Sequence, residues 1–225
     1  YLIFMNLTGS INYLNTLNNQ QKEAVLHDQG PLLILAGAGS GKTKVLTTRV
    51  AHLIESKKCF GNEILCVTFT NKAANEMRER VSLLTHNNTN AVPWLGTFHS
   101  IGNKILRKYA ETVGLKPSFT ILDTLDQLKL IKNILAAENI DSKNNPAKFI
   151  AYLIDQWKNK ALLPVDIKVS MSEPLKHNAL KVYKIYQERL RVMNCVDFGD
   201  LILHCVTIFK NFSGIQNTFK KNFKY

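Results

Sequence analysis

The chain has 225 residues and a mass of 25.5 kDa, enough for one large domain or for one domain with a sizeable insertion. Hydrophobic residues make up 45% of it and charged residues 20%, which excludes a disordered tail, a collagen-like repeat and a small disulfide-stabilised protein. The net charge of +12 favours a polyanionic partner such as nucleic acid. On charge alone, ribosomal association and an acidic membrane surface stay open.

The cysteines and the hydropathy indicate a cellular compartment. No two of Cys59, Cys66, Cys195 and Cys205 have CxxC spacing, and no histidine stands at a zinc-ligand offset from a pair of them. This pattern predicts free, buried thiols in a reducing compartment. No apolar run approaches the roughly 20 residues that span a bilayer. The sequence therefore predicts a cytoplasmic protein without a membrane partner.

The first half of the chain alternates short apolar runs with helical patterns. Strands and helices that alternate at this spacing predict βαβ units and a parallel sheet covered on both faces. Asn71 is the expected N-cap of the predicted helix Lys72–Leu84. The expected strands are Pro31–Ala36, Ile64–Phe69 and Pro93–Thr97, and the expected helices are Lys42–Glu55, Lys72–Leu84 and Ser100–Tyr109.

After Gly114 the sequence becomes predominantly helical. One more apolar run, Phe119–Leu122, follows Gly114, and the helical stretches begin after that run. The chain closes on a basic segment, Asn211–Tyr225, that contains no acid. Loops rich in Asn, Ser and Pro separate the helical stretches. The expected helices are Asp126–Glu138, Pro146–Lys160, Leu175–Met193 and Phe198–Lys210.

The segment Ala36–Thr43 reads Ala-Gly-Ala-Gly-Ser-Gly-Lys-Thr and matches the phosphate-binding P-loop pattern, with Ala36 where the first glycine usually stands. Its glycines allow successive N–H groups to point at phosphate oxygens, and the following helix adds its positive N-terminal end. Lys42 can then reach the β- and γ-phosphates, while the Thr43 hydroxyl can bind Mg²⁺. The alternative is a chance glycine-rich turn. The residues assigned to the phosphate site are Ala36, Gly37, Ala38, Gly39, Ser40, Gly41, Lys42, Thr43 and Lys44.

Three further segments occur with the P-loop in a characteristic order. Together they resemble the amino-terminal half of the UvrD/Rep/PcrA group of superfamily 1A DNA helicases, strongly over residues 15–112 and again at Val196–Leu201. The segments are Leu17–Val25 (LNNQQKEAV), Val67–Ala74 (VTFTNKAA) and Gly96–Ser100 (GTFHS).

The resemblance implies roles for residues outside the P-loop. Gln21 falls where the family reads the adenine edge, for which a side-chain amide can both donate and accept; the alternative is an exposed helix glutamine. Aromatic and polar residues match the family's single-strand contact segments, where rings stack on bases and Thr or Lys contacts the backbone. For Phe69 alone, a buried core position is the stronger interpretation. The residues that match are Phe69, Thr70, Asn71, Lys72, Thr97, Phe98 and His99.

The resemblance also implies a domain organisation. Residues 1–113 match the first part of a RecA-like ATP-binding domain 1A, residues 114–195 an inserted all-helical 1B subdomain, and residues 196–225 a return to domain 1A. The implied fold is α/β, a partial P-loop NTPase parallel sheet with a helical insertion. Trp157 could contact DNA, but its apolar helical neighbours favour a core position. The basic helix that carries Lys176, Lys181, Lys184, Arg189 and Arg191 suits either duplex DNA or a solvated face.

A hydrolytic carboxylate pair is missing from the sequence. ATP hydrolysis needs one carboxylate for the Mg²⁺ shell and a second to activate water, and no two carboxylates are adjacent in this chain. Asp123 after Phe119–Leu122 is the best substitute, but a helix start there is favoured, with Thr124 and Gln127 at capping-box spacing. The chain is therefore expected to end before the Asp-Glu strand of the family.

Two functions of different classes follow. The first is the ATP- and single-stranded-DNA-binding portion of a 3′–5′ ATP-dependent DNA helicase, with ATP and Mg²⁺ as cofactors and single-stranded and junction DNA as partners. The second is a non-hydrolysing module that binds ATP and single-stranded DNA. A P-loop kinase is a third possibility, but the sequence offers no acceptor-substrate site.

Overall fold

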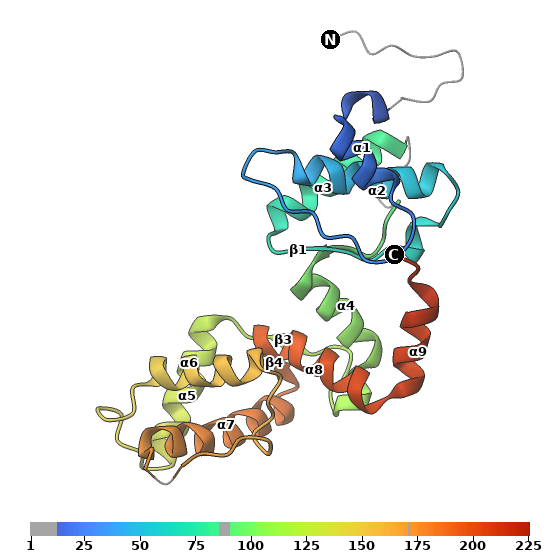
Figure 1. Cartoon of the computed structure of the whole chain (residues 1–225). Helices are drawn as coiled ribbons and strands as arrows, with labels where there is room; N and C mark the ends of the chain where they lie inside the picture. The colour runs from blue at the N-terminus through green and yellow to red at the C-terminus, as the bar shows by residue number, and fades with distance from the viewer. Residues whose placement is uncertain (1–12, 86–90, 171) are drawn as a thin grey trace. The chain divides into compact units, whose positions relative to one another are not determined.

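The computed structural model describes residues 13–85, 91–170 and 172–225 (Figure 1). Within them the chain divides into two compact units. Unit 1 extends to Phe98 and includes the carboxyl-terminal segment Thr218–Tyr225, and unit 2 is His99–Asn217. These boundaries differ from those that the sequence predicts for the helicase domains, and that functional subdivision stays a prediction.

Unit 1 contains a small parallel sheet and the helices that precede and follow its strands. Strand β1 pairs with β2 in parallel, with Cys66 opposite Leu95 and Thr68 opposite Thr97. The elements are α1 (Asn19–Leu26), α2 (Lys42–Glu55), β1 (Cys66–Thr68), α3 (Asn71–Thr85) and β2 (Leu95–Thr97), with short 3₁₀ helices at Tyr13–Thr16 and Gly61–Glu63.

Backbone hydrogen bonds flank β1 on both edges. The Cys66 N–H donates to the Trp94 carbonyl at 3.0 Å, and the Leu65 N–H donates to the Tyr225 carbonyl at 2.9 Å. Consecutive N–H groups of an extended chain point to opposite sides. The carboxyl-terminal residue therefore lies beside β1 on the edge away from β2.

The core of unit 1 forms where α2 and α3 pack together. Ala74, Met77 and Val81 recur at helical spacing on α3 and are all buried, together with Val50 and Leu53 of α2. Apolar residues at this spacing form one face, so the periodicity explains both the helix and its packing. The predicted helix Lys42–Glu55 has the same bounds in the structure, and the predicted helix Lys72–Leu84 is longer by one residue at each end.

The predicted strand Pro31–Ala36 is wrong for this structure. The segment has no regular secondary structure, and the Leu33 and Leu35 side chains are 80% and 85% exposed. A strand is stabilised by a neighbour that pairs with its backbone and covers its side chains, and none of the described strands pairs with this segment. The apolar run indicates strand propensity, but tertiary context decides whether the strand forms.

Unit 2 is mainly helical and holds a second parallel pair, β3 with β4, in which Thr120 lies opposite Cys195. Helix α4 begins one residue before the unit does. The elements are α4 (Phe98–Tyr109), a 3₁₀ helix at Ala110–Val113, β3 (Thr120–Ile121), α5 (Thr124–Ala137), α6 (Ala147–Asn159), α7 (Pro174–Val192), β4 (Cys195–Val196), α8 (Phe198–Asn211) and α9 (Ser213–Asn222), whose last residues belong to unit 1.

Helices α5, α6 and α7 enclose the main core of unit 2 (Figure 1). Ile131, Ile154 and Tyr183 come from one helix each, and all three side chains are fully buried. Trp157 stacks on Tyr183, with ring centroids 5.9 Å apart and an interplanar angle of 19°. Trp157 is thus half-buried and packs against this core, as its apolar helical neighbours favoured.

Two helix starts differ from the expected caps. The Thr70 hydroxyl, not the Asn71 side chain, accepts the Ala73 N–H at 3.1 Å, because α3 begins one residue earlier than predicted. The Asp123 carboxylate accepts the Asp126 N–H at 2.9 Å and is the N-cap of α5, so the expected helix start is present but without a box between Thr124 and Gln127.

The four cysteines are free and buried, as the sequence predicts. Burial raises the pKa of the Cys66 thiol to about 11 and that of Cys205 to about 12. These thiols therefore stay protonated at neutral pH and are poor nucleophiles. Across the described ranges, no helix is both long and apolar enough to span a bilayer.

Candidate phosphate-binding loop and aromatic surface

The P-loop curls through two left-handed glycines. Gly39 has a φ of 74° and Gly41 a φ of 85°, a region that side-chain-bearing residues rarely adopt. Gly41 is also the N-cap of α2, and no side chain caps that helix end. The first N–H groups of this 14-residue helix are therefore available to an anion, at the position where the sequence predicts a phosphate.

Lys42 lies over the loop that it is predicted to serve. Its ammonium donates to the Ala36 carbonyl at 2.7 Å and to the Gly37 carbonyl at 2.5 Å. The Ser40 hydroxyl donates to the same Gly37 carbonyl at 2.7 Å. Residues 36–40 and the Lys42 and Thr43 side chains are exposed, and Gly41 is half-buried, so these groups fit a nucleotide phosphate with its Mg²⁺.

Gln21 joins α1 to the P-loop. Its Nε2 donates to the Ser40 carbonyl at 3.2 Å, while its Oε1 accepts the Asn18 N–H at 3.1 Å in a reciprocal capping box. A Cβ on Gly41 would lie 3.0 Å from the same Nε2, which a small shift of the Gln21 side chain would relieve, so the left-handed φ is the stronger reason for glycine there. Gln21 therefore lies beside the loop, but both its amide nitrogen and its amide oxygen already take part in hydrogen bonds within the protein. Lys44, in contrast, donates to the Thr16 carbonyl.

Phe69 and Phe98 form an exposed ring pair in unit 1. The ring centroids are 5.5 Å apart, and the side chains are 86% and 44% exposed. A core phenylalanine would be covered, so the exposure excludes the core interpretation of Phe69. The two predicted contact segments thus meet through these rings, which offer aromatic surface to a flat partner.

The other predicted DNA contacts divide into exposed and covered residues. Asn71 and Lys72 are exposed at the start of α3, next to the capping Thr70. Thr97 is only 6% exposed at the end of β2, so its side chain is not presented on the surface. His99 is exposed and belongs to unit 2, where its ring meets Phe198 edge to face with centroids 5.9 Å apart.

Phe198 is a candidate that the sequence reasoning did not select. Its side chain is 51% exposed at the start of α8, although it lies within the Val196–Leu201 segment that resembles the helicases. The available signal was an aromatic residue between two acidic residues in a segment that matches the family. That signal does not distinguish a buried ring from an exposed one.

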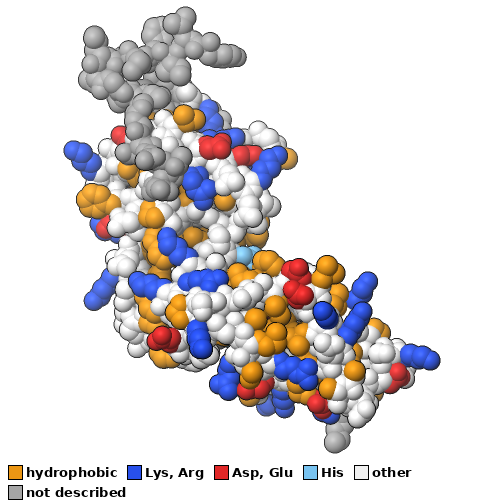
Figure 2. All heavy atoms as spheres, turned by 180° about the vertical axis from the view of Figure 1, so that it is seen from behind, with side chains coloured by type: hydrophobic (Ala, Val, Ile, Leu, Met, Phe, Trp, Pro, Cys, Tyr) orange, Lys and Arg blue, Asp and Glu red, His pale blue; other side chains and the backbone are white. Residues whose placement is uncertain are grey.

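The positive charge is spread over the surface. Figure 2 shows Lys and Arg side chains dispersed among apolar and uncharged ones on the visible face. On α7, Lys181 pairs with Glu138 at 2.9 Å and Arg191 with Glu188 at 3.1 Å. Such exposed pairs contribute little to stability, and they offset part of the basic character predicted for this helix. Among the described residues, no three His, Cys, Asp or Glu side chains form a metal-binding group.

Comparison with known proteins finds that the amino-acid sequence matches one family. Residues 17–225 match the family model described as the UvrD/REP helicase N-terminal domain. The chain is 45% identical over 217 residues to a "Probable DNA helicase II homolog" of Rickettsia conorii, covering 95% of this chain and 33% of that protein. It is 40% identical over 211 residues to the "ATP-dependent DNA helicase PcrA" of Leuconostoc citreum, covering 94% of this chain and 28% of that protein. The chain thus spans about a third of the length of the curated relatives it matches.

Proposed function

Because the chain belongs to the UvrD/REP helicase N-terminal domain family, we propose that it is the nucleotide-binding and single-strand-binding part of a 3′–5′ ATP-dependent DNA helicase. The observation that carries the proposal is the P-loop at the uncapped start of α2, with Lys42 lying over it. The exposed Phe69–Phe98 pair in the same unit supports the DNA-binding half. The proposed compartment is the cytoplasm.

The proposed domain organisation follows the resemblance. Residues 1–113 and 196–225 belong to a RecA-like domain 1A, and residues 114–195 form its helical 1B insertion. The mixed helix and parallel-sheet architecture is compatible with this assignment. The division into compact units at Phe98 and Asn217 describes packing, which need not follow the boundaries of an insertion.

The phosphate chemistry rests on charge and backbone donors. ATP with Mg²⁺ supplies a γ-phosphate whose transfer to water is the energy source of a helicase. In this chain, the loop N–H groups would bind phosphate oxygens, and Lys42, which now donates to the Ala36 and Gly37 carbonyls, would donate to phosphate. Thr43 is the residue that would hold Mg²⁺. The Gln21 amide, which now bonds to the Ser40 carbonyl and the Asn18 N–H, would be the group that contacts the base.

We assign binding, not hydrolysis, to this chain taken alone. Hydrolysis needs a second carboxylate beside the one that holds the Mg²⁺ shell, and the sequence contains no adjacent pair. Asp123, the substitute considered above, caps α5 in unit 2. Hydrolysis and unwinding, and junction DNA as a partner, belong to the proposal for the whole helicase.

Removing the Lys42 ammonium tests the nucleotide half of the proposal. Lys42→Ala should weaken MgATP binding at least tenfold in calorimetry, because a charge-assisted contact to phosphate is lost. Lys57→Ala removes the same charge just beyond the other end of α2 and is the matched control. Equal MgATP affinity of wild type and Lys42→Ala would refute the assignment of the loop.

Removing the Phe69 ring tests the DNA half. Phe69→Ala should weaken binding of a fluorescent oligo(dT) about fivefold or more, since stacking on an exposed ring is lost. Phe60→Ala is the matched control, because Phe60 is 76% exposed in the same unit and belongs to no predicted contact segment. If both variants bind oligo(dT) like wild type, the exposed pair is not a DNA surface.

A further inference from the structure

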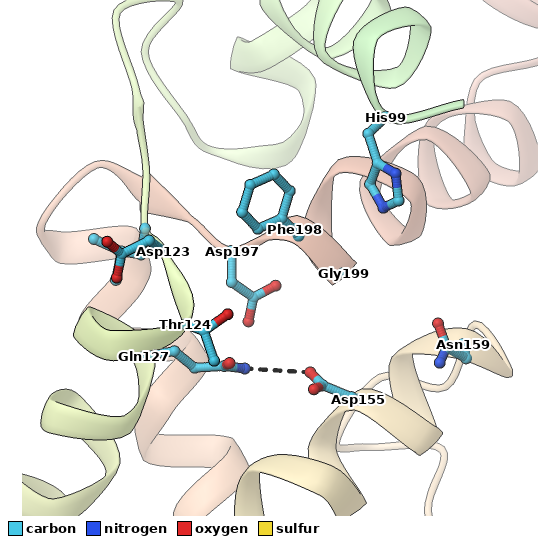
Figure 3. A pocket seen from close by; sticks show the side chains of 10 residues that line it. His99, Asp123, Thr124, Gln127, Asp155, Asn159, Asp197, Phe198 and Gly199 are labelled. Atoms are coloured by element: carbon cyan, nitrogen blue, oxygen red, sulfur yellow. Dashed lines mark hydrogen bonds between the residues drawn. The ribbon is translucent and has the colours of Figure 1, made fainter. Parts of the chain in front are cut away.

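Two hollows of opposite character lie in unit 2. One, of about 250 Å³, is lined mainly by polar side chains, and within it Gln127 donates to Asp155 at 3.2 Å (Figure 3). The other is a groove of about 520 Å³ on the carboxyl-terminal half of α7, and its wall is almost entirely apolar. The residues that line this groove all come from α7 and its C-cap: Lys184, Ile185, Glu188, Arg189, Val192 and Met193.

The α7 groove lies on the side of the helix that faces away from the core of unit 2. Tyr186 and Leu190 of α7 are buried in that core. Val192 and Met193 are instead 77% and 52% exposed. Because each residue of an α-helix advances by about 100°, Val192 points in nearly the opposite direction to Leu190. Exposed apolar residues that share one face in this way are typical of an interaction surface.

The groove residues are arranged symmetrically along the helix. About a point midway between Glu188 and Arg189, Ile185 is the counterpart of Val192, one apolar residue for another. The acid and the base at the centre are counterparts of each other. An identical helix that packs antiparallel, with a two-fold axis at this point, therefore places Ile185 against Val192 and Glu188 against Arg189, and each contact occurs twice.

The charges of the groove favour this antiparallel arrangement. Glu188 already pairs with Arg191 of its own helix at 3.1 Å, and an exposed carboxylate can accept from a second cation across the axis. The aliphatic stem of Lys184 can lie along Met193 of the other copy while its ammonium stays in water. A parallel arrangement would instead bring each Glu188 beside its own copy and each Arg189 beside its own copy, and like charges in contact are unfavourable.

We propose that the α7 groove is a self-association surface that takes a second copy of this chain, antiparallel about a two-fold axis between Glu188 and Arg189. The proposal goes beyond the proposed binding of nucleotide and DNA and does not depend on it. The groove covers residues 184–193, about 15 Å of helix. A contact this short gives a small interface, so we expect a weak dimer with a Kd on the order of 10–100 µM.

Sedimentation velocity over a concentration series tests the association. The mass of wild type should rise from 25.5 kDa towards twice that value. Val192→Arg should weaken association about tenfold or more, because it puts a charge into the apolar contact. Val165→Arg is the matched control, because Val165 is 83% exposed in the same unit outside the groove. A wild type that stays monomeric at about 500 µM would overturn the proposal. Equal association of wild type and Val192→Arg would also overturn it, by assigning the dimer to another surface.

A charge exchange tests the position of the two-fold axis. Glu188→Arg and Arg189→Glu should each weaken association on their own, because the first variant brings only cations together at the axis and the second only carboxylates. An equimolar mixture of the two should associate at least as tightly as wild type, since every cation then meets a carboxylate. A mixture that stays as weak as the separate variants would show that these residues do not meet across an axis.

Disulfide formation tests the direction of the two helices and detects a weak dimer. In the proposed register, a mixture of Ile185→Cys and Val192→Cys should cross-link faster than either variant alone, because position 185 faces position 192 of the other copy. Position 185 lies about 10 Å along the helix from its own copy, which is beyond disulfide reach. The four native cysteines are buried, so they contribute little background. Faster cross-linking of Ile185→Cys with itself would indicate parallel helices and refute the proposal.

The self-association surface and the proposed function can fail separately. Val192→Arg should bind MgATP with wild-type affinity, because the P-loop belongs to unit 1 and α7 to unit 2. If wild type does not bind MgATP or oligo(dT), the proposed function fails while the association experiments keep their meaning. If wild type binds both ligands but does not associate, only the self-association surface is refuted.

Discussion

The P-loop of unit 1 and the Asp197–Asp200 turn of unit 2 both stand at the start of a helix, yet different interactions hold them. The P-loop is exposed, and its own carbonyls accept from Lys42 and Ser40. Asp197 and Asp200 of the turn are buried, and both pair with Lys158, which lies 39 residues before Asp197. A motif held by near neighbours in sequence keeps its geometry in many contexts, whereas one held from a distance depends on the whole unit.

The largest expected effect on stability comes from removing Lys158, the distant partner of Asp197 and Asp200. Lys158→Met should lower the free energy of unfolding by about 3–5 kcal/mol, because it leaves two carboxylates buried without their cation. Urea denaturation measures the change. Lys160→Met, at an exposed lysine just beyond α6, should stay within about 0.5 kcal/mol of wild type. A small loss in Lys158→Met would mean that the carboxylates are reached by water.

The next effect compares apolar residues in the two units. Ile154→Ala should cost about 2–5 kcal/mol, because it opens a cavity among fully buried side chains of unit 2. Leu35→Ala, at a side chain that is 85% exposed before the P-loop, should change stability by no more than about 0.5 kcal/mol. Thermal or urea unfolding distinguishes the two. A large loss in Leu35→Ala would show that this run is packed in solution.

The smallest effect is a pH dependence in unit 2. Burial lowers the pKa of His204, with Lys158 acting in the same direction and Asp200 opposing both. The unfolded chain therefore binds the proton more readily, and stability should fall as pH drops through about 6.5 towards the lower folded-state pKa. Urea unfolding between pH 7.5 and 5.5 should show a smaller decline in His204→Gln than in wild type. Equal declines would assign the dependence to other groups.

Sequence periodicity was sufficient where one helix face is buried. Ala74, Met77 and Val81 mark the buried side of α3, and the predicted bounds of that helix differ from the observed ones by one residue at each end. A parallel sheet was also expected, and β1 and β2, which lie within the second and third predicted strands, pair in parallel over shorter segments. The run Pro31–Ala36 failed as a strand because apolar residues indicate a buried segment without providing the neighbour that buries it.

The candidate site divides along the same line. Gly39, Gly41 and Lys42 were selected from the sequence because the loop's conformation depends on residues within it. The exposure of Phe69 was not predicted from the sequence, since a phenylalanine after a strand is usually covered. Phe198 was missed because no local pattern shows that Asp197 and Asp200 turn towards a lysine on another helix.

The sequence by itself determined the P-loop motif and most of the helices, because each depends on residues close together in the chain, and it determined the family through several such local motifs in a fixed order. Only the tertiary structure decided which aromatic rings are exposed and which charges are buried. Exposure depends on segments far apart in sequence that pack together, and a buried charge is tolerated only where a distant partner meets it. In the sequence, Lys158 is one more basic residue in a chain of net charge +12. In the structure, it is buried and paired with Asp197 and Asp200 at the start of α8.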